Sequence, residues 1–132
     1  MPSIQNLHDP IKNRKIVNLC SMDSDSKWLI KNMANKVYVL RPTEISEKIK
    51  NGEVDTIFFR ASENSTDGFK IMGQLLKDSR LKENGCRLII IDETLENDLI
   101  NYVYERMDNL LKFLGFDKEV LAVQGENCIV YN

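Results

Sequence analysis

Short apolar runs alternate along this chain with segments whose apolar residues recur every three or four positions. Runs of this length, bounded by Gly, Pro or polar clusters, are typical of strands, and the wider spacing is typical of amphipathic helices. The early runs are mainly apolar and do not alternate strictly with polar residues, as in parallel strands that are buried on both faces. We expect strands over residues 16–20, 37–40, 54–59 and 86–91, and a closing hairpin of 120–123 and 128–131 around a turn at 124–127.

The segments between these expected strands have sequence features that are typical of helices. A short helix is expected around Trp28, and a second one, capped by Thr43, should end at Gly52. A third is marked by apolar residues at helical spacing from Phe69 to Leu76. The clearest helix runs from Leu95 to Leu114, where Gly115 stops it and Phe116 can fold back onto its last turn.

The resulting order, β-α-β-α-β-α-β-α-β-β, predicts an α/β fold. Right-handed crossovers place helices on both faces of the sheet. We therefore expect a three-layer Rossmann-like sandwich with a mostly parallel sheet and an antiparallel C-terminal hairpin. The chain has 132 residues, which favours a single domain. Residues 1–13 lack apolar periodicity and are expected to form a flexible N-terminal arm, with the folded domain over 14–132.

Charge and cysteine content exclude several classes of protein. The net charge is −2, which argues against a nucleic-acid partner. Residues 1–60 carry 10 basic and 7 acidic side chains, so the first half is the basic one. The longest apolar run, 88–91, is far shorter than the roughly 20 residues of a membrane span. Three separated cysteines without a C-x-x-C pair predict no metal ribbon and fit a reducing, cytoplasmic compartment.

The second half of the chain resembles the class I S-adenosylmethionine-dependent methyltransferases. The strand at 54–59 looks like the fourth strand of that superfamily, and Leu81-Lys82-Glu83-Asn84-Gly85 before 86–91 is similar to the turn that introduces its fifth. Leu114-Gly115-Phe116 before a terminal hairpin resembles a third element of the same fold. The resemblance covers residues 54–132.

The first half departs from that superfamily where a cofactor would bind. A glycine-rich turn should follow the first strand, but residues 20–26 read Cys-Ser-Met-Asp-Ser-Asp-Ser. The second strand should end in an acid for the ribose hydroxyls, but Arg41 follows it. The strand that carries the adenine-contacting loop has no room between Gly52 and Val54. The chain therefore looks like a truncated methyltransferase-like domain without a cofactor.

A short domain of this kind resembles the N-terminal domain of the anamorsin family, over about residues 14–132. That family works in cytosolic iron–sulfur cluster assembly, and a diflavin reductase supplies its electrons. The resemblance implies a non-catalytic, monomeric interaction domain with no catalytic, cofactor-binding or metal-binding residues of its own. The clusters would belong to a cysteine-rich domain whose motifs are absent from this sequence.

Three charged side chains stand at expected carboxyl ends of strands, where α/β proteins bind ligands: Arg41, Arg60 and Asp92. We expect them to line a crevice or a partner surface. Cys86 and Cys128 are expected to be buried, inert thiols, and Trp28 and Tyr38 to lie in the core or at its edge. Two alternatives stay open: a small methyltransferase or nucleotide-binding domain with an apolar pocket near Ser21, Arg41 and Phe59, and an unrelated Rossmann-like adaptor.

Overall fold

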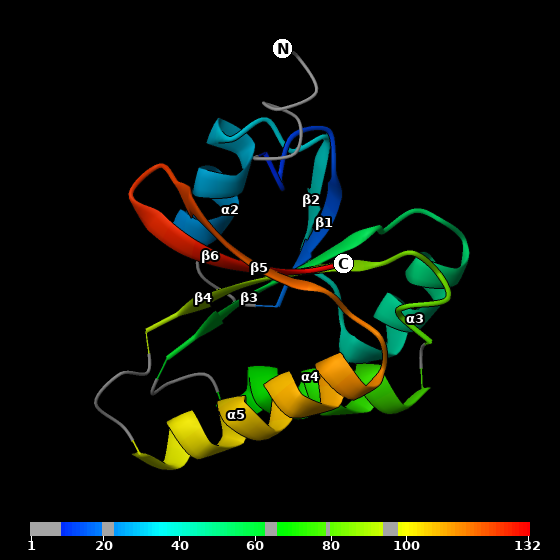
Figure 1. The fold of residues 1–132 in the computed structure, drawn as a ribbon. Coiled ribbons are helices and arrows are strands. Elements are labelled where there is room, and N and C mark those ends of the chain that lie inside the picture. Colours follow the sequence, from blue (N-terminus) through cyan, green and yellow to red (C-terminus); the bar gives the residue numbers. More distant parts are fainter. Residues whose placement is uncertain (1–8, 20–22, 63–65, 79, 94–97) are drawn as a thin grey trace.

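The computed structural model describes residues 9–19, 23–62, 66–78, 80–93 and 98–132. Strands and helices alternate up to a final hairpin (Figure 1). The strands are β1 (Lys15–Asn18), β2 (Lys36–Tyr38), β3 (Thr56–Ala61), β4 (Arg87–Asp92), β5 (Lys118–Val123) and β6 (Glu126–Tyr131). The helices are α2 (Asp23–Lys31), α3 (Pro42–Lys50), α4 (Thr66–Asp78) and α5 (Asp98–Phe113).

All six strands form one sheet in the order β2-β1-β3-β4-β6-β5. The first four pair in parallel, and β6 runs antiparallel to both β4 and β5. The expected mixed sheet with an antiparallel C-terminal hairpin is therefore confirmed. Among the described residues β2 is an edge strand, so α3 leads from that edge to β3 without an intervening strand, as expected for a truncated sheet.

The two faces of the sheet are covered unequally. Figure 1 shows α3, α4 and α5 on one face and α2 alone on the other. The cores follow the alternation of side chains along each strand. Ile57 and Phe59 of β3 pack in the larger core under α3–α5, whereas Phe58 packs in the smaller core under α2. Trp28 lies at the edge of the smaller core against Phe58, with ring centroids 6.0 Å apart, as expected.

The folded part begins earlier than the residue 14 expected from the sequence. Ile11 is fully buried in the core under α2, because the sheet face beside that helix is otherwise open. Asp9 accepts hydrogen bonds from the backbone N–H groups of Ile11 and Lys12 and so fixes the turn that inserts Ile11. Residues 9–13 thus belong to the domain, and the rest of the expected arm lies outside the described residues.

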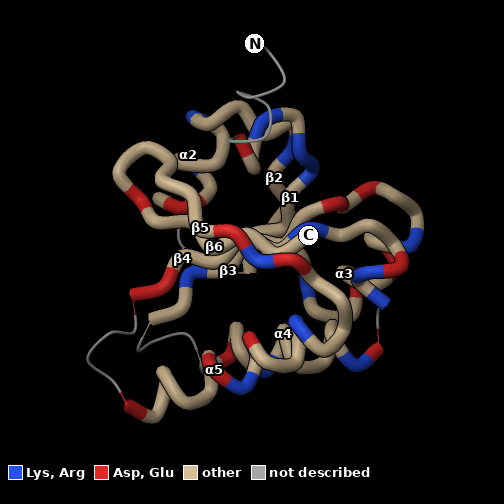
Figure 2. Tube along the Cα trace, viewed as in Figure 1, with Lys and Arg blue, Asp and Glu red and all other residues tan. Residues whose placement is uncertain are grey.

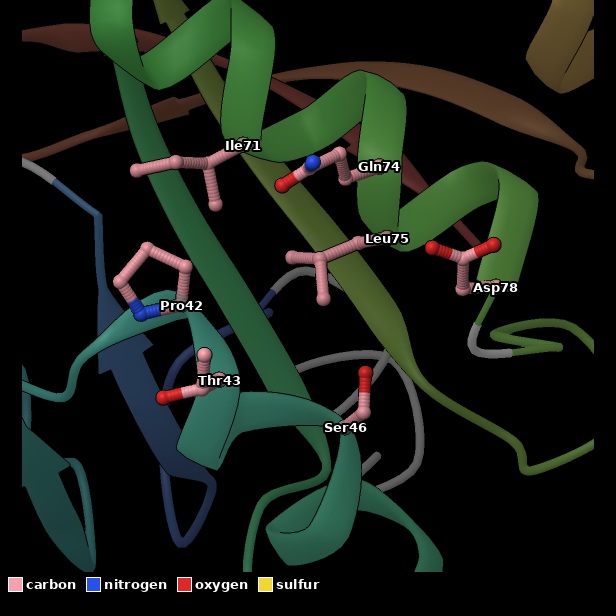
Figure 3. A pocket seen from close by; sticks show the side chains of 7 residues that line it. All are labelled: Pro42, Thr43, Ser46, Ile71, Gln74, Leu75 and Asp78. Carbon is pink, nitrogen blue, oxygen red and sulfur yellow. The ribbon is translucent and has the colours of Figure 1, made fainter.

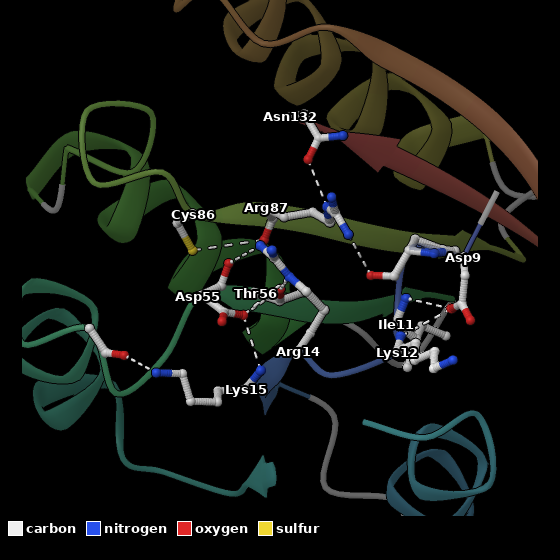
Figure 4. Close-up of polar contacts among 12 residues, drawn as sticks. Asp9, Ile11, Lys12, Arg14, Lys15, Asp55, Thr56, Cys86, Arg87 and Asn132 are labelled. Atoms are coloured by element: carbon white, nitrogen blue, oxygen red, sulfur yellow. Dashed lines mark hydrogen bonds and ion pairs between the residues drawn. The ribbon is translucent and has the colours of Figure 1, made fainter. Parts of the chain in front are cut away.

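Two arginines tie the amino ends of the strands together (Figure 4). Arg14 donates from Nε to Thr56 Oγ1 at 2.8 Å and from Nη2 to the carbonyl of Asp55 at 2.9 Å. Arg87 donates from Nη1 to the carbonyl of Pro10 at 2.7 Å and from Nε to the side-chain oxygen of Asn132 at 2.7 Å. These bonds join the first and last described segments to the central strands.

Several expected element ends are corrected. Helix α3 begins at Pro42 with Arg41 in the cap position, because proline suits the first turn, so Thr43 is not the cap. The hairpin turn is Gln124-Gly125, two residues with positive φ, which suits the twist of the flanking strands better than the four-residue turn expected. The return of Phe116 onto α5 is confirmed: its N–H bonds the carbonyl of Leu111 at 3.0 Å.

Candidate functional site

The carboxyl edge of the parallel strands is the place where an α/β sheet of this kind binds ligands. Strands β1, β3 and β4 end there, and α2 begins beside them. Asn18, the last residue of β1, is 3 % exposed and donates from Nδ2 to the hydroxyl of Ser26 at 3.0 Å. This bond fixes the start of α2 against the edge.

Arg60 of β3 occupies the centre of this edge on the α2 face. Its Nε donates to Asp25 Oδ1 at 2.9 Å, and its Nη2 lies 2.8 Å from the same oxygen. Nη1 pairs with Glu93, which follows β4, and Nη2 lies 3.6 Å from Glu126 of β6. One guanidinium therefore connects α2, β3, β4 and β6.

Burial and neighbouring charges shift the pKa of Arg60 in opposite directions. Its side chain is 14 % exposed. Burial lowers the pKa of Arg60, but the hydrogen bond and charge of Asp25, aided by Glu93 and Glu126, raise it above its usual value. Arg60 stays charged. Three carboxylates surround it, so the cluster has an excess of negative charge that disfavours a phosphate ligand.

The burial of the Asp25 carboxylate depends on its ion pair with Arg60. Asp25 lies in the first turn of α2 and is 2 % exposed. Its Oδ2 is buried and has no hydrogen-bond partner within the part of the chain that the structure describes. Removing an ionised carboxylate from water is costly unless a charge compensates it. The ion pair with Arg60 supplies that compensation, so the cluster is a structural unit.

The three side chains predicted for this edge do not come together. Asp92 pairs in register with Ala61, and its side chain belongs to the opposite face from Arg60. On that face burial, aided by the charges of Asp108 and Asp92, raises the pKa of Tyr104 to about 12. The side chain of the next residue, Glu93, lies on the same face as Arg60 and forms an ion pair with it. Arg41 follows β2, which β1 separates from β3 in the sheet, and its side chain makes no cap hydrogen bond.

Of the residues expected to line an enzyme pocket, the two that the structure describes do not form one. Phe59 is 1 % exposed and packs edge-on against Phe69, with ring centroids 4.9 Å apart. Arg41 is exposed, and Ser21 lies outside the described residues. Phe59 is therefore part of the core and faces no open pocket.

A separate hollow of about 210 Å³ lies between α3 and α4, on the face away from α2 (Figure 3). Its lining residues are Pro42, Thr43, Ser46, Ile71, Gln74, Leu75 and Asp78. It is smaller than the roughly 300–1,000 Å³ of ordinary small-molecule sites. Among its described lining residues Asp78 alone is ionisable, so these residues offer no acid–base pair.

Sequence reasoning missed a buried polar network between α5 and β6. The hydroxyls of Tyr104 and Tyr131 lie 3.0 Å apart, and Tyr131 donates to Asp108. Lys112 and Lys118 each lie 3.0 Å from an Asp108 oxygen. Burial raises the pKa of Asp108, but these hydrogen bonds outweigh it and hold the pKa below the usual value. The i, i+4 spacing of Asp108 and Lys112 is the only sequence signal for it.

The described cysteines behave as expected from the sequence. Burial raises the pKa of Cys86 to about 12 and that of Cys128 to about 11. Both thiols are buried and protonated at neutral pH. Among the described residues, no group of three or more His, Cys, Asp or Glu side chains could hold a metal ion, and no helix has the length and apolar character to cross a bilayer. Cys20 lies outside these residues.

Comparison with known proteins identifies the fold class. No family model and no curated protein matches the chain. A solved structure, the release factor-specific protein-(glutamine-N5) methyltransferase from Alicyclobacillus acidocaldarius subsp. acidocaldarius DSM 446, is similar with a TM-score of 0.52. The sequences are 14 % identical, and the match covers 98 % of this chain and 86 % of that one. The chain thus has a methyltransferase-like fold, and identity this low shows the fold alone.

Proposed function

We propose that this chain is a non-catalytic protein-interaction domain of an anamorsin-like protein of cytosolic iron–sulfur cluster assembly. The observation that carries the proposal is the ion cluster of Arg60, Asp25 and Glu93 at the carboxyl edge of the sheet. In the methyltransferase fold that edge would hold the cofactor. Here the cluster joins four elements and gives the edge a structural role.

The residues of this edge do not fit S-adenosylmethionine. Arg60 is engaged by three carboxylates, and the second strand is followed by Arg41 where a ribose acceptor would be needed. No cofactor is therefore assigned to this chain. Iron–sulfur clusters would be held by a separate cysteine-rich domain, since Cys86 and Cys128 are buried and protonated.

A diflavin reductase is the partner we assign, and the basic side of α2 and β2 is its docking face. Lys27, Lys31 and Lys36 are exposed on these two neighbouring elements, and Figure 2 shows basic residues around β1 and β2. Flavin domains of such reductases are often acidic. Opposite charge would steer their encounter with this face.

The test is the affinity of the chain for a purified diflavin reductase, measured at about 50 and 300 mM salt. Reversing the three charges in K27E/K31E/K36E should weaken binding by about tenfold or more and flatten its salt dependence. A matched variant, K50E/K70E/K77E, changes three lysines on α3 and α4 and should bind normally. Equal binding by the two variants would refute the docking face, and no binding by the unaltered chain would refute the proposed partner.

The alternative is a small S-adenosylmethionine-dependent methyltransferase or nucleotide-binding domain. Only the fold favours it, and fold does not fix function. Direct binding of the cofactor separates the two functions, because an interaction domain requires none.

A further inference from the structure

Helix α5 carries large apolar side chains on a face that no other described element covers. Leu99 is 70 % exposed, Tyr102 55 %, Leu110 42 % and Phe113 86 %. Together with Arg106 at their centre they form a single line along the helix, which we call the α5 stripe. Exposed apolar surface gathered in this way marks an interaction site more often than scattered exposure does.

The spacing of residues in the α5 stripe is the same whether it is followed from the N-terminal or from the C-terminal end of the helix. Its members follow one another at steps of three, four, four and three residues, with Arg106 in the middle. When two copies of such a helix pack antiparallel about Arg106, Leu99 meets the second copy's Phe113, and Tyr102 meets its Leu110. A two-fold interface needs a patch that is complementary to itself, and this spacing provides one.

The charges beside the stripe agree with the same arrangement. Asp98 stands in the first turn of α5, and Lys112, which also pairs with Asp108, stands in the last turn. Antiparallel packing therefore brings opposite charges within two residues' height of each other, about 3 Å, at both ends. Antiparallel helix dipoles add a small favourable contribution.

Arg106 does not oppose this pairing, although it lies on the two-fold axis. Its guanidinium bends back one turn, where Nη1 donates to the Tyr102 hydroxyl at 3.0 Å and the cation lies 5.7 Å from the ring centroid. The second copy's guanidinium bends in the opposite direction. The two charges are therefore displaced by about 6 Å each from the axis.

We propose that the α5 stripe is the interface of an antiparallel two-fold homodimer of this chain. The proposal is independent of the reductase partner and replaces the monomer expected from the sequence. The stripe spans about 21 Å of helix, so the interface is small and we expect the dimer to dissociate on dilution.

The mass of the chain in solution tests the proposal, by light scattering from about 5 to 500 µM. The unaltered chain should change from monomer to dimer over this range. L99E/F113E places acids opposite one another at both ends and should stay monomeric, as should L99K/F113K, whereas their equimolar mixture should form a heterodimer. The control I30E/V39E charges two exposed apolar residues elsewhere and should dimerise normally.

Cross-linking then tests the orientation, in a background in which Cys20 is replaced by serine and the described native thiols are buried. An antiparallel pair brings residue 106 close to its own copy and holds the two residues 99 about 20 Å apart. A bismaleimide of about 10 Å reach should therefore link R106C and leave L99C unlinked. A monomer at every concentration, a dimer that survives L99E/F113E, or equal linking of both cysteines would overturn the proposal.

Discussion

Arg60 shows how one side chain determines the character of the carboxyl edge. Its pairing with Asp25 joins α2 to the sheet at the edge where α/β sheets of this kind bind ligands. Replacing it by methionine keeps the apolar stem and leaves Asp25 buried without a cation. We expect Arg60→Met to lower the free energy of unfolding by about 3 kcal/mol.

Urea unfolding at pH 7 measures that loss. Arg41→Met is the matched control, because the Arg41 side chain is exposed and makes no cap hydrogen bond. It should change stability by less than about 0.5 kcal/mol. Equal effects of the two substitutions would contradict a structural role for Arg60.

Asp108 should make the free energy of unfolding depend on pH in the acidic range. Its pKa is lower in the folded protein than in the unfolded chain, so folding is favoured by the ionised form. The contribution is complete above the unfolded pKa, near 4, and is lost as the pH falls through the folded pKa. Asp108→Asn should therefore cost about 2 kcal/mol at pH 7, and the difference from the unaltered protein should shrink below about pH 4.

Urea unfolding of both proteins from pH 7 to pH 3 measures this difference. Tyr131→Phe removes the hydroxyl that donates to Asp108 and should move the acid transition to higher pH. A difference between the unaltered protein and Asp108→Asn that stays constant down to pH 3 would contradict the assignment.

Single residues were the hardest features to predict from the sequence. Asp25 and Arg60 are 35 positions apart, and only the folded chain brings them together. Asp92 and Glu93 are neighbours, and a shift of one position decides which of them faces Arg60. The carboxyl edge of the sheet could be located from the order of the elements. Which side chains pair with each other at that edge depends on the register of the strands, which the sequence does not give.

At the scale of elements, α4 contains two glycines in different surroundings. A Cβ atom on Gly68 would lie 2.2 Å from Cε2 of Phe59, whose buried ring has little room to move, whereas a Cβ on Gly73 would meet nothing within 4 Å. Alanine favours a helix over glycine by about 1 kcal/mol. We expect Gly73→Ala to stabilise the protein by up to that amount and Gly68→Ala to destabilise it by about 1–3 kcal/mol.

Thermal unfolding of the two variants measures these opposite effects. The pair has the same chemical change in the same helix, so only the surroundings differ. If both substitutions raised the melting temperature, the close packing of α4 on β3 would be wrong.

Helices and strands were predictable to within a few residues because their apolar spacing is regular. The ends were less predictable. Pro42 begins α3 although Thr43 is the better cap type, and Met33 takes the left-handed φ of 68° at a place where glycine is usual. Such ends are decided by the geometry of the connection to the next strand, which local sequence does not contain.

At the scale of the whole molecule, the fold class followed from the alternation of elements, whereas the strand order did not. Within the described residues, that order leaves β2 as an edge strand, and α2 is the one helix over its face of the sheet. Ile11 fills part of the open face, which explains why an apparently featureless N-terminal segment is packed. The exposed α5 stripe on the other side needed the structure, because its spacing also fits ordinary burial.

We propose that the carboxyl edge does not bind S-adenosylmethionine, and calorimetric titration of S-adenosylmethionine and S-adenosylhomocysteine into the chain tests this directly. We expect no binding heat at ligand concentrations up to about 1 mM, which corresponds to a binding free energy weaker than about −4 kcal/mol. Saturable binding with one site per chain would contradict the claim and favour the methyltransferase alternative.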